Sequence, residues 1–203
     1  MSCGAGMTDE RFTLRGVIDT SRLLASVEDR PELWGEITLR QEYEGTAHAD
    51  TETIFLRGPV VPPDGAPRNV LDIIDSVEYG AANVMLAGYA DVLGQLSNLM
   101  KIEQLGRMMV VSLRPGGRIT EHTDEGEYAQ HYQRFHIAMT DSPRASLTVA
   151  GETQSFGQHE LWRFNHRLPH SAVNDGDEPR IHLIFDAVVD EWWWPHDREG
   201  VDD

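Results

Sequence analysis

The stretch RMMVVSLRPGG, at residues 107–117, decides the fold, because a run of β-prone residues there ends in a Pro-Gly-Gly turn. Further short runs of the same kind follow, each bounded by Gly, Pro, Asp or Asn. They are RFHIAMT (134–140), ASLTVAG (145–151), ELWRFN (160–165), SAVN (171–174) and RIHLIFDAVV (180–189). Several short strands separated by turns are typical of an antiparallel sandwich or barrel.

The sequence before residue 107 favours helices. Residues 19–33 combine capping residues with an apolar side, which predicts a helix. Residues 69–100 repeat apolar residues at helical spacing, and Gly80 predicts a break between two helices. A β-prone run, TIFLR, lies within residues 50–58. Helices followed by strands predict an α+β, mainly β fold, with a helical layer packed on the sandwich or barrel.

We expect one domain over residues 11–195, with a helical N-terminal part (11–106) and a β core (107–190). Residues 1–10 are small and polar and predict a disordered tail, and residues 196–203 form an acidic tail. The proline-rich segment 60–68 predicts a surface connection, and a lid over a pocket is the alternative.

Charge and cysteine content narrow the partners and the compartment. The 203 residues carry a net charge of −17, which disfavours nucleic acid and anionic membranes as partners. Cys3 is the only cysteine, so no intrachain disulfide can form, and a reducing compartment is expected. Neither a membrane-spanning run nor a secretory signal is visible, which predicts a cytoplasmic protein.

The candidate chemistry lies in RITEHTDEGEYAQHYQRFHIAM (118–139). Residues two apart in a strand share a face, so His122 and Asp124 would present an imidazole and a carboxylate side by side. His170, brought across the barrel, would complete a facial triad that leaves three positions open on Fe(II). An isolated His-x-Asp is weak evidence, so the rest of the pattern matters.

Three further residues support a metal site that also holds an anion. Arg180 follows His170 by ten residues, and a hairpin at residues 174–179 would return it beside the strand that begins near His170. A guanidinium there suits the distal carboxylate of 2-oxoglutarate. Arg134 and His136 share one strand face, and a cationic pair inside a barrel needs an anion.

Residues 111–186 resemble the aspartyl/asparaginyl β-hydroxylase family of 2-oxoglutarate oxygenases, whose fold is a double-stranded β-helix of the cupin or jelly-roll type. The motifs that carry the resemblance keep their order and spacing. They are S-L-R-P-G-G (112–117), H-T-D (122–124), R-F-H (134–136), G-x-x-x-L-W-R-F-N (157–165), His170 and Arg180.

The resemblance implies a Fe(II)- and 2-oxoglutarate-dependent dioxygenase that consumes molecular oxygen. It implies His122 and His170 as iron ligands. Some family members and related halogenating oxygenases have a small residue at the position of Asp124, which leaves a site for water or halide. Asp124 fills that position, so hydroxylation is favoured over chlorination.

The resemblance also implies the contacts to 2-oxoglutarate. Arg180 would bind the distal carboxylate with help from Ser112, and Arg134 and His136 would contact the other carboxylate. The family precedent indicates a small-molecule or peptide substrate: a free amino acid or an amino-acid side chain within a peptide. The sequence gives no oligomeric state.

Some interpretations stay open. A cupin-type metalloenzyme without 2-oxoglutarate and a non-catalytic metal-binding module on the same fold are the alternatives. Arg40, His48 and Arg57 are candidates for substrate selection, although surface salt bridges are the simpler role for the arginines. His182 suits either a pocket wall or a buried structural role. We expect the remaining histidines at the surface or in loops: His131, His159, His166 and His196.

Overall fold

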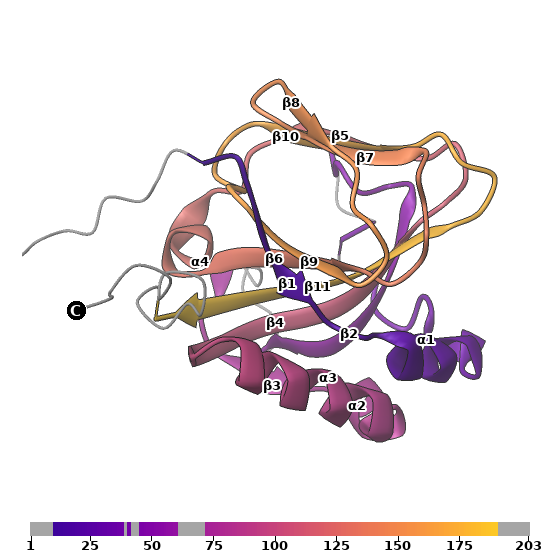
Figure 1. The fold of residues 1–203 in the computed structure, drawn as a ribbon, viewed down its shortest axis with the longest axis vertical. Coiled ribbons are helices and arrows are strands. Elements are labelled where there is room, and N and C mark those ends of the chain that lie inside the picture. The colour runs from indigo at the N-terminus through magenta and orange to yellow at the C-terminus, as the bar shows by residue number, and fades with distance from the viewer. Residues whose placement is uncertain (1–9, 39, 42–44, 61–71, 191–203) are drawn as a thin grey trace, which may run out of the picture.

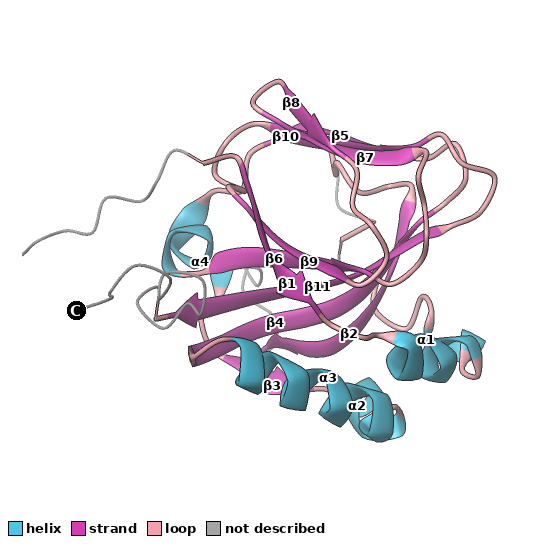
Figure 2. Cartoon of the chain, in the orientation of Figure 1, coloured by secondary structure: helices cyan, strands magenta, loops and turns pink. Residues whose placement is uncertain are grey.

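The computed structural model describes residues 10–38, 40–41, 45–60 and 72–190. Two antiparallel sheets face each other, and three helices lie beneath the larger sheet (Figure 1). Strands dominate over helices, as Figure 2 shows. The arrangement is a jelly roll, so the predicted α+β, mainly β class with a double-stranded β-helix core is confirmed.

The larger sheet has seven strands in the order β1-β9-β6-β11-β4-β2-β3. Its strands are β1 (Phe12–Val17), β2 (Thr51–Pro59), β3 (Ser76–Glu78), β4 (Ile102–Leu113), β6 (Gln133–Ala138), β9 (Glu160–Phe164) and β11 (Arg180–Val189). The long strands β4 and β11 pair along most of their length, and β6 pairs with the other side of β11.

The smaller sheet has the order β5-β10-β7-β8. Its strands are β5 (Arg118–His122), β7 (Ala145–Val149), β8 (Glu152–Gln154) and β10 (His170–Asn174). Figure 1 shows it lying across the interior from the larger sheet, so the inner faces of both sheets look into one space.

Helices α1 (Ser21–Glu28), α2 (Gly80–Val84) and α3 (Leu86–Leu99) lie on the outer face of the larger sheet, and the 3-10 turn η1 (Pro31–Leu33) follows α1. Helix α4 (Gly126–His131) connects β5 to β6 and lies apart from them, because its Tyr128 and Ala129 line the same cavity as Arg134 of the inner face. Val110 of β4 joins an apolar core with Tyr89, Val92 and Leu96 of α3. Its neighbour Val111 faces the interior instead, as alternation along a strand requires. None of the helices in the described ranges has the length and apolar content needed to cross a bilayer.

The inner face of the larger sheet carries charged and polar residues as well as apolar ones. Along β11 these are Arg180, His182 and Asp186, all of them buried. Charged groups away from water need partners or a ligand. The candidate site therefore lies between the two sheets.

Within the described part of the range 69–100, helix is present from Gly80 onward. Residues 76–78 form β3 instead, in which Val77 pairs with Gly58 of β2 and is 45% exposed. Short apolar runs fit a strand as well as a helix, so spacing alone does not separate the two. Gly80 begins α2, and the break between two helices lies at Met85, between α2 and α3, so its predicted position is wrong.

The N-terminal part, residues 11–106, is not mainly helical. It supplies β1, β2, β3 and the beginning of β4 to the larger sheet. β1 pairs with β9 and β2 pairs with β4, so these N-terminal strands extend the sheet on both sides of its core strands. The TIFLR run does form a strand, β2. Residues 1–9 of the expected N-terminal tail (1–10), the whole expected acidic tail (196–203) and residues 61–68 of the proline-rich segment lie outside the described residues.

The hairpin predicted at residues 174–179 does not form. β10 pairs with β5 and β7, whereas β11 pairs with β4 and β6, so this turn carries the chain from one sheet to the other. The Asn174 side-chain amide donates to the carbonyls of Leu113 (3.0 Å) and Glu178 (2.9 Å), which fixes the crossing. Arg180 consequently faces His170 across the interior and does not lie beside it in one sheet.

We expect Gly88→Ala to lower the free energy of unfolding by about 1–3 kcal/mol, because α1 and α3 approach too closely for a methyl group. A Cβ at Gly88 would lie 2.6 Å from the Leu23 Cα of α1. Gly94→Ala on the same helix is the control, since nothing lies within 4 Å of its Cβ position. Urea unfolding should show Gly94→Ala unchanged or stabilised by roughly 0.5–1 kcal/mol. Equal effects of both variants would contradict this packing.

Candidate metal centre

His122 ends β5 and His170 begins β10, and the two residues are paired directly across the smaller sheet. Their rings lie 4.2 Å apart between centroids. The Nδ1 of His122 is 2.8 Å from the Thr120 carbonyl, and the Nδ1 of His170 is 2.9 Å from the Leu168 carbonyl. An N–H at each Nδ1 donates to that carbonyl, which leaves both Nε2 atoms free to bind a metal ion.

Asp124 lies just beyond β5, where its backbone N–H donates to the His166 carbonyl at 3.1 Å. Its Oδ1 is 3.8 Å from the Nε2 of His122. One ligand atom from each of His122, Asp124 and His170 lies within 4.8 Å of the others. The three predicted ligands are therefore brought together, although Asp124 reaches the histidines from a loop.

The donor set fits Fe(II). Two imidazoles and one carboxylate on one side of an ion are the ligands of non-haem iron sites that keep positions open. The Nε2 of His122 is buried and has no hydrogen-bond partner among the described residues. Burial lowers the pKa of His170 to about 4, so its imidazole is neutral at pH 7 and can act as a ligand.

The carboxylate of Asp124 is held by Arg134 of β6. Burial alone would raise the pKa of Asp124, but the guanidinium of Arg134 lowers it to about 2. The Nη1 of Arg134 donates to the Oδ2 of Asp124, which leaves Oδ1 facing His122. The candidate metal-ligating carboxylate is thus ionised and oriented by the chain itself.

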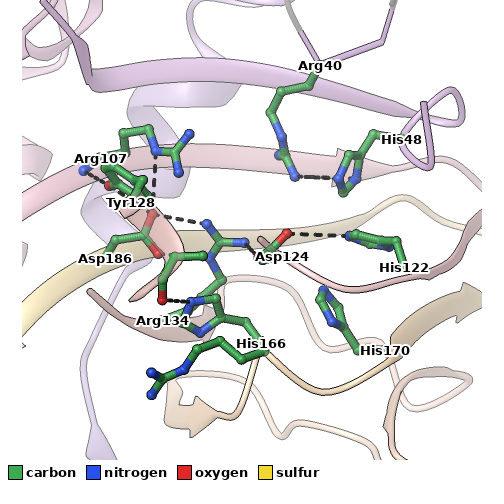
Figure 3. A network of polar contacts seen from close by, with 12 residues as sticks. Arg40, His48, Arg107, His122, Asp124, Tyr128, Arg134, His166, His170 and Asp186 are labelled. Atoms are coloured by element: carbon green, nitrogen blue, oxygen red, sulfur yellow. Dashed lines mark hydrogen bonds and ion pairs between the residues drawn. The ribbon is translucent and has the colours of Figure 1, made fainter. Parts of the chain in front are cut away.

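Arg134 is itself fixed by Asp186 of β11. Its Nε donates to the Oδ1 of Asp186 at 2.8 Å and its Nη2 donates to Oδ2 at 3.1 Å, in a bidentate pair (Figure 3). Asp186 also accepts from the Tyr128 hydroxyl at 3.1 Å and lies 3.6 Å from the Nε of Arg107. The anion that the sequence required beside Arg134 is supplied by the chain itself.

His136 is not the cationic neighbour of Arg134 that the sequence suggested. Its side chain shares the inner face with Arg134, as predicted, while Phe135 and Ile137 pack in the core beneath. Burial, followed by the nearness of His182 and of the Arg180 guanidinium, holds the pKa of His136 well below the ordinary value. The His136 ring is therefore neutral, and its Nδ1 lies 3.4 Å from the Nδ1 of His182, which is neutral as well.

Arg180 is the deepest cation of the interior and is 2% exposed. Burial lowers its pKa to about 10, so it remains charged at pH 7. Its Nε is buried without a hydrogen-bond partner, and among the residues that the structure describes no carboxylate lies within ion-pair distance of it. An unpaired buried guanidinium is costly, which indicates that an anionic ligand belongs there.

Ser112 does not lie beside Arg180. In the pairing of β4 with β11, Ser112 is opposite Ile181, whereas Arg180 is opposite Leu113. Successive strand residues point to opposite faces, so the Ser112 hydroxyl faces away from the interior. The predicted contact of this hydroxyl with the carboxylate held by Arg180 is contradicted by the register.

A cavity of about 270 Å³ opens beside the metal-binding residues. Its wall contains His122, Asp124, Glu125 and Arg134, together with Arg40 and Arg107. A narrower extension continues past His122 and His170 to Arg180 and His136. The site therefore has an outer chamber and an inner end, with the three candidate ligands between them.

Arg40 and His48, two of the candidates for substrate selection, line the outer chamber. Arg40 is 8% exposed and its Nη2 lies 3.2 Å from the Nε2 of His48, whose ring packs edge-on against His122 with centroids 4.9 Å apart. Arg40 is therefore not a surface residue, whereas Arg57 does lie 3.7 Å from Glu78 in a partly exposed ion pair. No pattern in the sequence distinguished Arg40 from the other arginines.

Three more residues of the site were not singled out from the sequence: Arg107, Tyr128 and Asp186. Asp186 had a usable signal, because an aspartate within the apolar run RIHLIFDAVV rarely stays buried without a function or a partner. His166, expected in a loop or at the surface, is buried and lies 3.1 Å from the Ala129 carbonyl. His131 is exposed as expected, His159 is partly exposed, and His196 lies outside the described residues.

Comparison with known proteins identifies relatives of this arrangement. The model of a family described as Aspartyl/Asparaginyl beta-hydroxylase matches residues 81–189, more than half of the 203 residues, including every predicted site residue. L-proline cis-4-hydroxylase of Rhizobium meliloti (strain 1021) is 27% identical over 77 residues. That match covers 38% of this chain and 28% of the relative, so less than a third of the relative is represented.

Solved structures resemble the fold. An oxidoreductase of the 2OG-Fe(II) oxygenase family from Burkholderia pseudomallei superimposes with a TM-score of 0.50 and 11% identity, over 83% of this chain and 76% of that one. The Cupin_2 domain of an XRE family transcriptional regulator from Enterobacter cloacae gives a TM-score of 0.34 and 17% identity, over 40% and 80% of the two chains.

We expect Asp186→Asn to reduce the free energy of unfolding by about 3–5 kcal/mol, because it leaves the buried Arg134 and Arg107 without their shared carboxylate. It should also weaken binding of Fe(II) by the apoprotein, since Arg134 is no longer held in place to orient Asp124. Asp175→Asn, which removes an exposed ion pair with Arg118, is the control. Urea unfolding and metal titration would measure both effects. A stable Asp186→Asn variant with unchanged metal affinity would contradict this role.

We expect the metal-free protein to lose stability as the pH falls from 7 to 5. The folded pKa values of His136 and His182 are lowered by burial, so below about pH 6.5 the unfolded chain takes up protons that the folded chain does not. Each such histidine contributes up to roughly 1.4 kcal/mol per pH unit. The lowered pKa values of Asp124 and Asp186 act only below about pH 4. Urea unfolding at three pH values should show a decline that becomes shallower in His182→Gln. Stability that rises on acidification would oppose this assignment.

Proposed function

The chain belongs to the aspartyl/asparaginyl β-hydroxylase family, and we propose that it is a Fe(II)- and 2-oxoglutarate-dependent dioxygenase that hydroxylates an unactivated C–H bond of a small molecule. The observation that carries the proposal is the combination, in one interior, of a His-Asp-His ligand set and an unpaired buried arginine. The ligand set accounts for iron, and the arginine accounts for a dicarboxylate co-substrate.

His122, Asp124 and His170 would hold the iron from one side. Bound Fe(II), with 2-oxoglutarate and molecular oxygen, supplies the oxidising power for insertion of a hydroxyl group into a C–H bond. The chain contributes neutral imidazoles, a carboxylate that Arg134 keeps ionised, and apolar walls that exclude water. These candidate ligands lie between the outer chamber and the inner end of the cavity, so a co-substrate and a substrate could reach the ion from these two sides.

Arg180 would anchor the distal carboxylate of 2-oxoglutarate at the inner end of the cavity. Ile119, Leu147 and Ala172 of the smaller sheet line the same end, so the charge pair would form away from water, where it is strong. Arg134 and His136 also line this end and are proposed to contact the other carboxylate. The neutral ring of His136 can donate one N–H for that purpose.

Asp124 bears on the reaction type. Its carboxylate fills the coordination position that a halide needs, so hydroxylation is proposed and halogenation is not. A cupin-type metalloenzyme without 2-oxoglutarate would leave the buried charge of Arg180 unexplained, and so would a non-catalytic metal-binding module. Both alternatives predict that 2-oxoglutarate has no effect on the metal-loaded protein.

A free amino acid is the proposed substrate class. The outer chamber has the volume of a small-molecule site and not of an extended groove. The relative named L-proline cis-4-hydroxylase makes L-proline the first compound to test. Succinate release from 2-oxoglutarate, measured with and without each amino acid, would identify the amino acid whose presence stimulates the conversion of 2-oxoglutarate.

The proposal is tested by anaerobic titration of the Fe(II)-loaded protein with 2-oxoglutarate. We expect a weak visible charge-transfer band in the wild type and no band in His170→Ala, which loses an iron ligand. Arg180→Ala should need at least about tenfold more 2-oxoglutarate to reach the same absorbance, since the distal carboxylate loses its charged partner.

Arg118→Ala is the matched control, because Arg118 is exposed on β5 and pairs only with an exposed aspartate. It should titrate like the wild type. Absence of a band from protein shown to contain iron would favour the cupin alternative. An Arg180→Ala variant with wild-type affinity for 2-oxoglutarate would remove Arg180 from the site.

A further inference from the structure

Arg40 is a second buried guanidinium that has no acidic partner among the residues that the structure describes. It is 8% exposed and lines both the outer chamber and its narrow extension. Its Nη2 contacts the His48 ring and its Nη1 lies 3.7 Å from the Sδ of Met109. Among the described residues, no carboxylate lies within ion-pair distance of Arg40. Burial lowers its pKa to about 10, so it still carries its charge at pH 7.

The hydrogen-bond partner of Arg40 at the site is the imidazole of His48. A ring nitrogen can accept a hydrogen bond from the guanidinium, but an imidazole carries no negative charge and so does not balance the charge of Arg40. Figure 3 shows the Arg40 guanidinium directed at the His48 ring. The Arg40 side chain also lines the outer chamber, where a ligand can reach it.

Arg107 adds to the same wall of the chamber. Its guanidinium carbon lies 3.5 Å above the centroid of the Tyr128 ring, which holds it flat against the wall. Its Nε is buried without a hydrogen-bond partner, and the 3.6 Å contact with Asp186 shares a carboxylate that already binds Arg134 twice. Arg107 can thus give a hydrogen bond to a ligand without losing its position.

The carboxylates around the outer chamber do not pair with Arg40. Asp124 and Asp186 are both engaged by Arg134, and Glu125, the third carboxylate of this region, is exposed at the rim of the chamber. Among the described residues, none of these carboxylates lies within ion-pair distance of Arg40. A negatively charged group of a ligand in the outer chamber would therefore give Arg40 the partner that a buried guanidinium needs.

We propose that Arg40, assisted by Arg107, binds the α-carboxylate of a free amino-acid substrate. The inference rests on the proposed function and deepens it, because it separates a free amino acid from a residue inside a peptide, whose α-carboxylate is an amide. The carboxylate of Glu125 lines the same chamber at its exposed rim and provides a partner for the ammonium group of such a substrate. Arg180 would bind 2-oxoglutarate at the inner end of the cavity, so the co-substrate and the substrate carboxylate would each bind to a different arginine.

The test compares amino acids with their α-carboxamides on the wild-type protein. Fe(II)-loaded protein saturated with 2-oxoglutarate, kept anaerobic, is titrated with each L-amino acid and with its carboxamide by calorimetry. At least one amino acid should bind, and its carboxamide should bind about tenfold more weakly or worse, since it cannot form the charge-assisted pair. This comparison needs no variant, so a folding defect cannot imitate the result.

Variants then assign the effect to Arg40. Arg40→Gln should weaken binding of the amino acid by roughly tenfold or more and leave binding of the carboxamide and of 2-oxoglutarate unchanged. Arg40→Lys should recover part of the loss, because it restores the charge but not the fork of donors. Arg118→Gln removes one positive charge from an exposed position of β5 and should bind both ligands like the wild type.

The outcomes separate this inference from the proposed function. Equal binding of an amino acid and its carboxamide would overturn the inference, and so would binding of no amino acid by protein that still forms the band with 2-oxoglutarate. An Arg40→Gln variant that still binds the amino acid more tightly than its carboxamide, to the same extent as the wild type, would also overturn the inference. Loss of the 2-oxoglutarate band in the wild type would instead overturn the proposed function.

Discussion

The buried ion pair between Asp186 and Arg134 is the interaction on which the site depends. Buried pairs stabilise a fold only modestly, because removing both charges from water costs nearly as much as their attraction returns. What this pair provides is position. It joins β11 to β6 at the inner face of the larger sheet and aims a guanidinium at Asp124. The orientation of the candidate metal-ligating carboxylate is therefore decided by residues far from it in the sequence.

The sequence predicted those parts of the structure that follow from local pattern. The short β-prone runs predicted the strands of the jelly roll, and the alternation of residues along β6 predicted that Arg134 and His136 lie on one face. The spacing of His122, Asp124 and His170 in the sequence was sufficient to predict that the three side chains lie close together. The turn after Asn174 was misassigned because a hairpin and a crossing between sheets use the same turn residues. The face of Ser112 depended on the register of β4, which no local pattern reports.

Arg40 was one of three candidates for substrate selection, but its burial could not be predicted. It lies in a segment without strand or helix periodicity, so no pattern indicated that its side chain turns inward. The composition is strongly acidic, yet the interior gathers four arginines: Arg40, Arg107, Arg134 and Arg180. Two of these, Arg40 and Arg180, are left without a carboxylate among the described residues. A fold that buries unpaired charge gives up stability that a bound anion restores, which couples ligand binding to folding.

Arg40 and Arg180, the two arginines without a carboxylate partner among the described residues, lie in different parts of the chain, and this difference concerns substrate choice. Arg180 and the His-Asp-His set lie within residues 81–189, which the family model matches, whereas Arg40 and His48 lie before them. The residues proposed for metal and co-substrate binding therefore all lie in the core that the family model matches. The arginine proposed to bind the substrate carboxylate comes from a loop packed against that core, where the sequence can change without disturbing the proposed iron site. Under the proposed function, the matched core would supply the chemistry, and the segment that carries Arg40 would select the molecule on which that chemistry acts.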